Sequence, residues 1–486
     1  MSNSSYERVD ARPTKRFFVE MLTRDLALED AILDLLDNCV DGIQRSLEQR
    51  NTELDTDSQP YQGFWAKITI SPEKFVIEDN CGGIPWSEHQ RAFRMGRPAV
   101  SEQESALNAS QFLSVGVYGI GMKRAIFKMG ADANISTQNN ASAYTIPISP
   151  DWMQDEDNWN LSAESQTSLF QEDGTKIVVQ DLHQDIAERF REKDFIDTLL
   201  DKMQGYYAFI LSKGFSVQVN GNEVHPDPIL IRYSEQTTNQ DTVRPYVFKG
   251  EVEDVEVFLI VGLREPIPDA EKTLAEQEVN RSSTAYAGWT VICNDRVVLY
   301  CNRDELTGWG TAGVPRYHNQ FISISGVVEF RGDPSKLPTT TTKRGLNYSS
   351  SLYQQTLNRM REGLLIFIDF TNKWKSKEKE AREKVASVPA VSYSEAKEKA
   401  ETTLKLTSVQ RGISGSQYKP KLPLPPIQNP DVRISFQKDK EEVLELAEEL
   451  LQDIDKLRER EIPKQVGIKS FEFAFEQLVE KHKNSK

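Results

Sequence analysis

The chain has few of the side chains that hold metal ions or form covalent cross-links. Its 486 residues include only five histidines and four cysteines. The histidines show no HExxH spacing and the cysteines form no CxxC pair, which argues against a zinc site. A disulfide framework is also disfavoured, because a chain of this length can build its own hydrophobic core. We therefore expect buried free thiols at Cys39, Cys81, Cys293 and Cys301.

Long apolar runs and a signal peptide are also missing. The longest apolar run, GLLIFIDF at 363–370, contains an acid and is shorter than the roughly 18 residues that cross a membrane. The polar start, MSNSSYERVDARPTKR, lacks the apolar core of a signal peptide. These absences predict a cytoplasmic location and no membrane partner. The net charge of −15 disfavours a surface built as a whole for nucleic acid, although a local basic groove is compatible with it.

Length and hydrophobic content predict several packed domains, and the mixture of helix and strand patterns predicts the α+β class. A chain of 486 residues exceeds the usual size of one domain, and 38% hydrophobic residues suffice for packed cores. Periodicity predicts a helix over 26–48, two strands within 64–79 and a helix over 87–95. The expected divisions are a first α/β domain at 1–228, a smaller α/β domain at 229–375, a charged helical segment at 376–411, a Pro-rich linker at 412–432 and a helical element at 433–486.

The predicted helix over 26–48 carries polar residues where a buried helix would be apolar. Within EDAILDLLDNCVDGIQR at 29–45, residues three and four apart share a face, so Asp34, Asn38 and Asp41 form one polar column. Two carboxylates and an amide on one side of an otherwise apolar helix require a polar partner.

A glycine-rich segment, GVYGIGMK at 116–123, precedes a second predicted helix. It is not a Walker loop, since no GxxxxGK[ST] occurs in the chain, and it does not follow a strand of a βαβ unit, which weakens a dinucleotide site. Gly116, Gly119 and Gly121 leave backbone N–H groups and a helix N-terminus free to meet an anion, for which phosphate is the natural guest. A tight turn without a ligand is the alternative.

Two further motifs place polar groups at strand ends. In VIEDNCGGIP at 76–85, Asp79 ends a strand just before two glycines. A carboxylate there can accept a hydrogen bond from an exocyclic amine such as that of adenine, while glycine lets the ring approach the backbone. In DGTKIVVQ, Thr175 begins a strand, and its hydroxyl could join the same set of hydrogen bonds. For each motif an ordinary strand-edge turn is the alternative.

Together, and in this order, these motifs resemble the GHKL ATPase superfamily of gyrase-type topoisomerases, ninety-kilodalton heat-shock chaperones, histidine kinases, MutL and MORC proteins. That family carries E-x-x-x-N-x-x-D on its first helix, then D-x-G-x-G, then G-x-x-G-x-G after a mobile lid, then a GT dipeptide on a later strand. The counterparts here are D-LLD-N-CV-D, DNCGG, GVYGIG and Gly174-Thr175. The resemblance covers roughly the first 225 residues and is closest in layout to MORC-like and chaperone-like members. It implies a Bergerat-type ATP-binding α/β sandwich followed by a transducer-like domain.

The resemblance also implies a site for ATP and Mg²⁺. Asn38 would ligate the metal ion through its side-chain oxygen, Asp34 would act as general base, and Asp79 with Thr175 would bind the adenine amine. The expected cofactor-binding residues are Asn38, Asp79, Gly83, Gly116, Gly119, Gly121, Met122, Lys123 and Thr175. Lys123 has a second interpretation as a solvent-facing lysine, and one of Asp37 and Asp41 would pair with nearby structure instead of ligand.

The sequence departs from the family pattern at two positions. Asp34 stands where the family has glutamate, so the proposed base is one methylene shorter, and an offset near 1 Å can cost on the order of 10²-fold in rate. Cys81 stands at the first glycine of D-x-G-x-G, which predicts an altered turn but leaves Gly83 in place. We therefore expect ATP binding to survive both changes more readily than hydrolysis, which would be slow.

In the topoisomerase, MutL and MORC branches, a lysine of the second α/β domain senses the γ-phosphate. The resemblance assigns this role to Lys343 in LPTTTTKRGLNY, with Arg344 as its rival and an exposed loop cation as the alternative. It implies an ATPase in which ATP closes a lid at 96–115 and gates formation of a homodimer. Besides a second copy of the chain, DNA or a separately encoded effector protein is considered as a partner of this ATPase. Bacterial anti-phage defence is one hypothesis for the role of the ATPase.

Two other functions are compatible with these residues. A histidine kinase module lacks a recognisable phosphoacceptor helix here and fits the second domain poorly. A non-catalytic nucleotide-binding scaffold, or a chaperone-like protein, would bind ATP through the same motifs. Steady release of phosphate distinguishes the switch from the scaffold.

Overall fold

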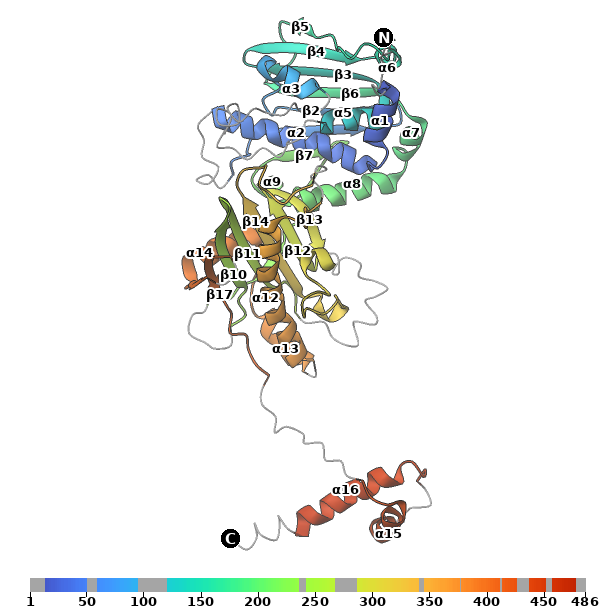
Figure 1. Ribbon diagram of the computed structural model, residues 1–486, viewed down its shortest axis with the longest axis vertical. Helices are drawn as coiled ribbons and strands as arrows, with labels where there is room; N and C mark the ends of the chain where they lie inside the picture. Colours follow the sequence, from blue (N-terminus) through green and yellow to red (C-terminus); the bar gives the residue numbers. More distant parts are fainter. Residues whose placement is uncertain are drawn as a thin grey trace, which may run out of the picture. The chain divides into compact units, whose positions relative to one another are not determined.

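The chain forms mixed α/β structure, traced in Figure 1. The computed structural model describes residues 14–49, 59–94, 120–235, 242–266, 286–340, 345–375, 377–410, 413–425, 437–451 and 457–477. It divides into two compact units, Met1–Pro425 and Pro426–Lys486. The α+β class predicted from the sequence is confirmed, and all four cysteines are buried and free, as expected.

The first part of the larger unit is built on an eight-stranded sheet. Its strands are β1 Trp65–Ile70, β2 Phe75–Asp79, β3 Gly130–Asn139, β4 Ser142–Ile148, β5 Glu164–Gln166, β6 Gly174–Leu182, β7 Ser216–Val219 and β8 Asn222–Glu223. Their order across the sheet is β5-β4-β3-β6-β2-β1-β7-β8, and β1 and β7 form the parallel pair in an otherwise antiparallel sheet. Strand β1 buries Ala66, Ile68 and Ile70 and turns the residues between them outward, which is the period of two expected for a half-buried strand.

Helices cover the buried face of this sheet (Figure 1). They are α1 Lys15–Thr23, α2 Leu28–Gln49, α5 Gly121–Met129, α7 Gln184–Arg189, α8 Lys193–Tyr206 and α9 Ala208–Ser212, with η1 Trp86–Glu88, α3 His89–Phe93 and α6 Pro150–Gln154 at the edges. Helix α2 packs along α5, and its middle is buried on all sides. The two-layer α/β sandwich is therefore organised around α2.

A second, seven-stranded sheet follows. Its strands are β10 Tyr246–Val252, β11 Val255–Leu263, β12 Gly288–Cys293, β13 Arg296–Asn302, β14 Ile324–Arg331, β16 Thr407–Val409 and β17 Gly415–Tyr418, in the order β13-β12-β14-β11-β10-β17-β16. Helix α12, Ser351–Lys373, packs on one face. The other face is covered by α14, Tyr393–Thr403, by α9, and by the small sheet of β9, Leu230–Arg232, and β15, Ala390–Ser392. The remaining short helices are η2 Glu305–Thr307, η3 Asn319–Phe321 and α13 Glu378–Ala386.

The structure differs from the sequence expectation beyond residue 375. The charged segment at 376–411 is not only a solvated helical face, because Tyr393, Ala396 and Ala400 bury one side of α14 against the second sheet. Residues 413–425, expected in the linker, also pack on this domain: β17 pairs with β10, and the Trp374 indole donates to the carbonyl of Pro423 at 3.0 Å. The rest of the expected linker, 426–432, lies outside the described residues.

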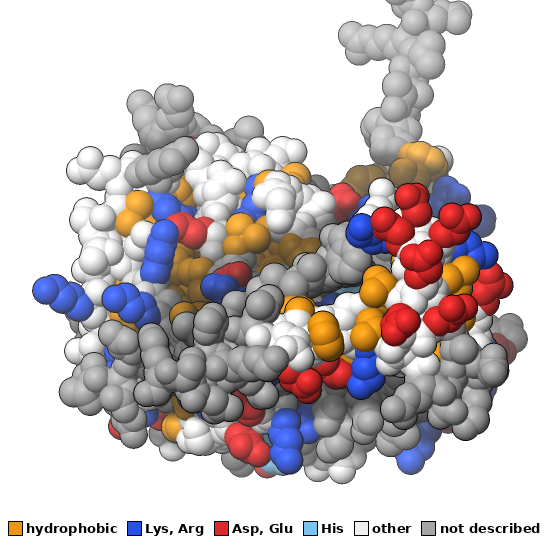
Figure 2. Space-filling model, turned by 90° about the horizontal axis from the view of Figure 1, so that it is seen from below, with side chains coloured by type: hydrophobic (Ala, Val, Ile, Leu, Met, Phe, Trp, Pro, Cys, Tyr) orange, Lys and Arg blue, Asp and Glu red, His pale blue; other side chains and the backbone are white. Residues whose placement is uncertain are grey.

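The second unit contains two helices, α15 Lys440–Leu450 and α16 Ile462–Phe475, which confirms the helical C-terminal region. They contact each other around Ala447 and Val466. Helix α15 is acidic, with glutamates Glu441 and Glu442 in its first turn. Figure 2 shows Asp and Glu side chains crowded beside hydrophobic ones on the face seen there.

Buried charges join the first sandwich to the second sheet. Arg296, the first residue of β13, forms an ion pair with Asp37 of α2, and the hydroxyl of Tyr207 donates to the same carboxylate. Beside them, Asp295 accepts hydrogen bonds from the Tyr61 hydroxyl at 2.9 Å and the Lys213 ammonium at 2.7 Å. Burial alone would raise the pKa of Asp295, but the nearby cations hold it below its ordinary value, so this carboxylate is charged in the joint.

We predict that Arg296→Gln destabilises the protein by about 3–5 kcal/mol, because it leaves the Asp37 carboxylate buried without its countercharge. Urea unfolding measures the change. The double variant Asp37→Asn, Arg296→Gln should recover part of the loss, since neither charge is then left alone. The control is Arg189→Gln, which removes an exposed guanidinium paired with Glu192 and should change stability little. A loss no larger than that of the control would contradict the assignment.

Candidate functional site

A hollow lies where α2 faces strands β2 and β6 of the first sheet. It has a volume of about 400 Å³ with its open mouth included. Its lining residues are Leu35, Asn38, Cys39, Gly42, Arg45, Ile77, Asp79, Cys81, Gly83, Ile84, Met122, Thr175 and Ile177. Five of the residues predicted from the sequence meet here, namely Asn38, Asp79, Gly83, Met122 and Thr175.

Asp79 presents a carboxylate at the base of this hollow. It ends β2 opposite Thr175 of β6, and its Oδ1 accepts a hydrogen bond from the backbone N–H of Cys81 at 2.8 Å. Burial raises the pKa of Asp79 to about 6, although hydrogen bonds from Cys81 and Cys39 oppose the shift. At neutral pH the group is therefore an ionised acceptor, matched to an N–H donor on a ligand.

The turn after Asp79 explains how Cys81 can replace a glycine. Gly82 and Gly83, which follow Cys81, adopt positive φ of 92° and 64°. Cys81 itself is not among the residues with positive φ. A Cβ on Gly83 would lie 1.9 Å from the carbonyl oxygen of Gln138, so this position admits only glycine. The strained conformations therefore fall on glycines, and Cys81 fits without strain.

Two thiols extend the polar base of the hollow. The Cys39 thiol donates to Oδ2 of Asp79, with sulfur and oxygen 3.5 Å apart. Hydrogen bonding to Cys81, followed by burial, raises the pKa of Cys39 well above its ordinary value, and burial raises the pKa of Cys81 to about 11. Both thiols are therefore protonated at neutral pH and support the charge on Asp79 instead of competing with it.

Thr175 belongs to a hydroxyl pair at the strand ends. Its Oγ1 lies 3.1 Å from Oγ1 of Thr137, which also accepts the backbone N–H of Ile84 at 2.8 Å. The hydroxyl of Thr175 therefore connects the carboxylate end of β2 to the glycine turn. The role of Thr175 in supporting a contact between Asp79 and a ligand stays a prediction.

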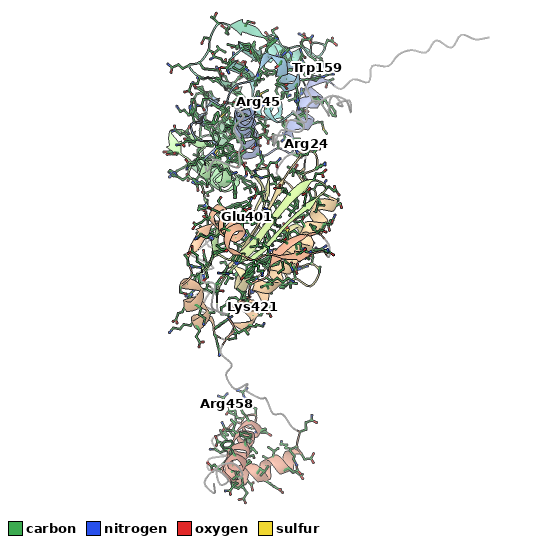
Figure 3. All side chains as sticks on the ribbon, turned by 90° about the vertical axis from the view of Figure 1, so that its left-hand side faces the viewer. Arg24, Arg45, Trp159, Glu401, Lys421 and Arg458 are labelled. Atoms are coloured by element: carbon green, nitrogen blue, oxygen red, sulfur yellow. The ribbon has the colours of Figure 1, made fainter. Side chains whose placement is uncertain are left out.

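Asn38 and Arg45 line the same side of the hollow from α2. They are seven residues apart, two helical turns, and so share a face. The Asn38 side-chain nitrogen is sealed without a hydrogen-bond partner among the described residues, while Arg45 donates from Nη2 to the carbonyl of Gly83 at 2.7 Å. Figure 3 labels Arg45 on this helix. Arg45 was missed from the sequence, although its spacing from Asn38 could have identified it.

The residues present fit a Mg²⁺ ion held mainly by a ligand. Mg²⁺ prefers oxygen donors, keeps several waters, and is usually bound through one or two protein groups plus substrate phosphates. Asn38 offers one amide oxygen, and no group of three His, Cys, Asp or Glu side chains suited to a metal occurs in the described part of the chain. Without phosphates this site would hold the ion poorly.

Asp34 lies outside the lining of the hollow, beside the first turn of α5. Its side chain is 4% exposed and pairs with Nη2 of Arg124, which is 11% exposed. A Cβ on Gly121, the first residue of α5, would lie 3.6 Å from Oδ2 of Asp34. The backbone N–H groups at the start of α5 and the carboxylate of Asp34 therefore meet in one place. Arg124 was not predicted, because only the packing of α5 against α2 brings it to Asp34.

Lys123 does not occupy the solvent-facing position that was one of its two interpretations. The solvent-facing interpretation is wrong, since the side chain is 1% exposed. Its ammonium donates to the carbonyls of Ala92 and Arg94, both at 2.7 Å, at the C-terminal end of α3. Its role in binding phosphate stays a prediction. Of the two acids left open, Asp37 pairs with Arg296, as described above.

The remaining predicted residues cannot be placed. Gly116, Gly119, the lid at 96–115, Lys343 and Arg344 lie outside the described residues. On either side of these residues in the sequence, Thr339 and Leu346 form an isolated bridge.

Comparison with known proteins identifies the first sandwich. Residues 26–181 match the family model described as histidine kinase-, DNA gyrase B-, and HSP90-like ATPase. This range contains α2, the hollow and the start of α5. A search of curated proteins returned no match. No helix in the described ranges is long and apolar enough to cross a bilayer.

We predict that binding of a non-hydrolysable ATP analogue weakens as the pH falls through about 6. Protonation turns Asp79 from an acceptor into a donor, so at pH 5 the affinity should be about tenfold lower than at pH 7.5. Calorimetric titration at the two pH values measures the change.

Asp79→Asn is the control for this titration. It should bind weakly at both pH values, because an unmatched amide in the pocket costs about 1–3 kcal/mol. Any pH dependence that it retains belongs to the phosphates. If Asp79→Asn binds the analogue with the affinity of the wild type, and both proteins show the same pH dependence, Asp79 does not belong to the site.

Proposed function

Because residues 26–181 belong to the histidine kinase-, DNA gyrase B- and HSP90-like ATPase family, we propose that this chain binds ATP with Mg²⁺ and hydrolyses it as a conformational switch. The observation that carries the proposal is the buried carboxylate of Asp79 at the base of a hollow between α2 and the sheet. Members of the family generally bind and hydrolyse ATP, and their dimerisation on ATP binding is common.

In this proposal the base of ATP enters the hollow and its amine donates to Asp79. The ring passes over Gly83, where a side chain has no space. The phosphates then extend toward the first turn of α5, whose N–H groups and helix dipole favour negative charge. Mg²⁺ would join Asn38 to the phosphates and offset their charge.

Hydrolysis requires a water aligned on the γ-phosphorus. Asp34 lies beside the first turn of α5, so its carboxylate is placed to orient that water and to accept its proton. The water oxygen bonds to phosphorus as the bond to the ADP oxygen breaks. Asp34 touches the reacting water and is the catalytic residue of the proposal.

The joint described above gives the switch a route to the second sheet. Asn38 and Asp37 are neighbours on α2, and Asp37 is paired with Arg296 of β13. A ligand that moves α2 therefore moves one side of this ion pair. Because a ligand shifts an equilibrium only through contacts that differ between the two states, Lys343 on the γ-phosphate would supply the contact specific to ATP.

The partners proposed for the switch are a second copy of the chain and either DNA or a separately encoded effector protein. The anti-phage role rests on the three-part layout of the chain. A scaffold that binds ATP without turnover is the second candidate, and the pairing of Asp34 with Arg124 favours it, since one oxygen of the carboxylate is already occupied by a guanidinium.

We predict that Asp34→Asn retains ATP binding and lowers hydrolysis by at least about 10²-fold, because the amide cannot accept a proton. Phosphate release under saturating ATP measures the rate, and calorimetry with a non-hydrolysable analogue measures binding. Glu172→Gln serves as the control, since this carboxylate accepts from Asn80 outside the hollow and should not affect either readout. Turnover of Asp34→Asn at the wild-type rate would place the base elsewhere. A wild type that binds ATP and releases no phosphate would favour the scaffold.

We further predict that Lys343→Ala weakens ATP-dependent dimerisation while ADP affinity stays nearly intact. The charge-assisted hydrogen bond to the γ-phosphate is worth about 1.5–3 kcal/mol, which shifts the dimer equilibrium about tenfold or more. Sedimentation with ADP and with an ATP analogue separates the two states. Lys336→Ala is the matched control, because Lys336 lies seven residues earlier in the sequence, is exposed and pairs with Asp254. Equal ATP-induced dimerisation in all three proteins would rule out Lys343 as the sensor.

A further inference from the structure

The ion pair between Arg124 and Asp34 is unusual in its surroundings. Both side chains are nearly sealed from solvent, at 11% and 4% exposed, and they join two helices, α5 and α2, at the point where the phosphates would lie. The Nε of Arg124 is buried without a hydrogen-bond partner in the part of the chain that the structure describes. A buried guanidinium N–H without a hydrogen-bond partner destabilises a fold, so packing alone does not explain this arrangement.

The geometry limits what Arg124 can do for Asp34. Among the described residues, the ion pair and the closest approach of Gly121 both involve Oδ2. Asp34 is too short to move far, because its carboxylate is two bonds from a buried helical backbone. With Oδ2 held by Arg124, the second oxygen, Oδ1, has a defined direction.

We propose that Arg124 is a positioning residue for hydrolysis, which fixes Oδ2 of Asp34 so that Oδ1 meets the attacking water. The inference rests on the proposed function and deepens it. Oδ1 takes the proton as the water oxygen bonds to the γ-phosphorus and the bond to the ADP oxygen breaks. Arg124 exchanges no proton and forms no bond to substrate. Its guanidinium holds the carboxylate in one orientation, which a short side chain requires for correct reach.

Four variants test this assignment: Arg124→Gln, Arg124→Lys, Asp34→Asn, and the double variant Asp34→Asn, Arg124→Gln. Turnover at saturating Mg²⁺-ATP is measured beside calorimetric affinity for a non-hydrolysable ATP analogue. Arg124→Gln should lower turnover by about 10- to 100-fold while affinity changes by less than about threefold. Arg124→Lys should recover part of the turnover, because it restores the charge without the planar fork.

The double variant supplies the readout that a merely structural role would not change. If Arg124 acts through Asp34, its removal has no further effect on turnover once the carboxylate at position 34 has been replaced by an amide. It also protects the test from misfolding, since neither charge is left buried alone. Thermal melting of every variant checks the fold, and Arg189→Gln, which removes an exposed guanidinium, controls for loss of an arginine.

Four results would overturn the assignment. Wild-type turnover in Arg124→Gln shows that positioning is not needed. Weaker affinity with unchanged turnover places the guanidinium on the phosphates instead. A full additional loss in the double variant shows that Arg124 acts independently of Asp34. If the wild type binds ATP without turnover, both hydrolysis and this role are rejected. If the wild type hydrolyses ATP and Arg124→Gln leaves turnover unchanged, only this role is rejected.

Discussion

Helix α2 must bury polar side chains in its middle, and this constraint organises the rest of the structure. Asp34, Asp37 and Asn38 lie within a segment that is covered by the sheet and by neighbouring helices. A buried carboxylate without a partner costs several kcal/mol, so each needs a cation at a fixed distance. Arg124 meets Asp34 from α5, and Arg296 meets Asp37 from β13. Hydrophobic burial drives these elements together, but the charges determine which residues of α5 and β13 face α2.

The same constraint places the hollow and the second sheet on one turn of α2. Successive residues of a helix point about 100° apart, so Asp37 and Asn38 face different neighbours while sharing a backbone. Asn38 faces the hollow and Asp37 faces Arg296. A rotation or shift of α2 on ligand binding therefore changes the geometry of a buried ion pair, in which small displacements carry large energies. In the proposed switch, this one turn of α2 and its ion pair with Arg296 would be enough to couple the hollow to the second sheet.

Much of the fold could be predicted because local pattern and burial agree. The alternation in β1 follows directly from one buried face, and the many apolar residues of α2 follow from its place in the core. The pattern failed beyond residue 375 for a physical reason. Residues Gly415–Tyr418 contain no apolar alternation, and they become a strand because β10 has a free edge for them to pair with. The buried side of α14 consists largely of alanines among Lys and Glu, so its sequence is typical of a solvated helix.

The candidate site divides in the same way between local and tertiary information. Asp79, Gly83 and Thr175 could be predicted because each lies at a strand end or turn whose chemistry is visible in a few residues. The partners of Asp34 and Lys123 could not, because they depend on how α5 and α3 pack, which no local motif records.

This packing also changes the meaning of the aspartate at position 34. Judged from the sequence, its short side chain falls one methylene short of the ligand. In the structure the reach of Asp34 depends on the separation of α2 and α5, which Arg124 of α5 spans to pair with the carboxylate. A glutamate at position 34 would have to fit its longer side chain into the same space between α2 and α5, where Arg124 already contacts the carboxylate of Asp34. The aspartate and the arginine are therefore one arrangement, and the packing of α5 on α2 fixes where the carboxylate lies.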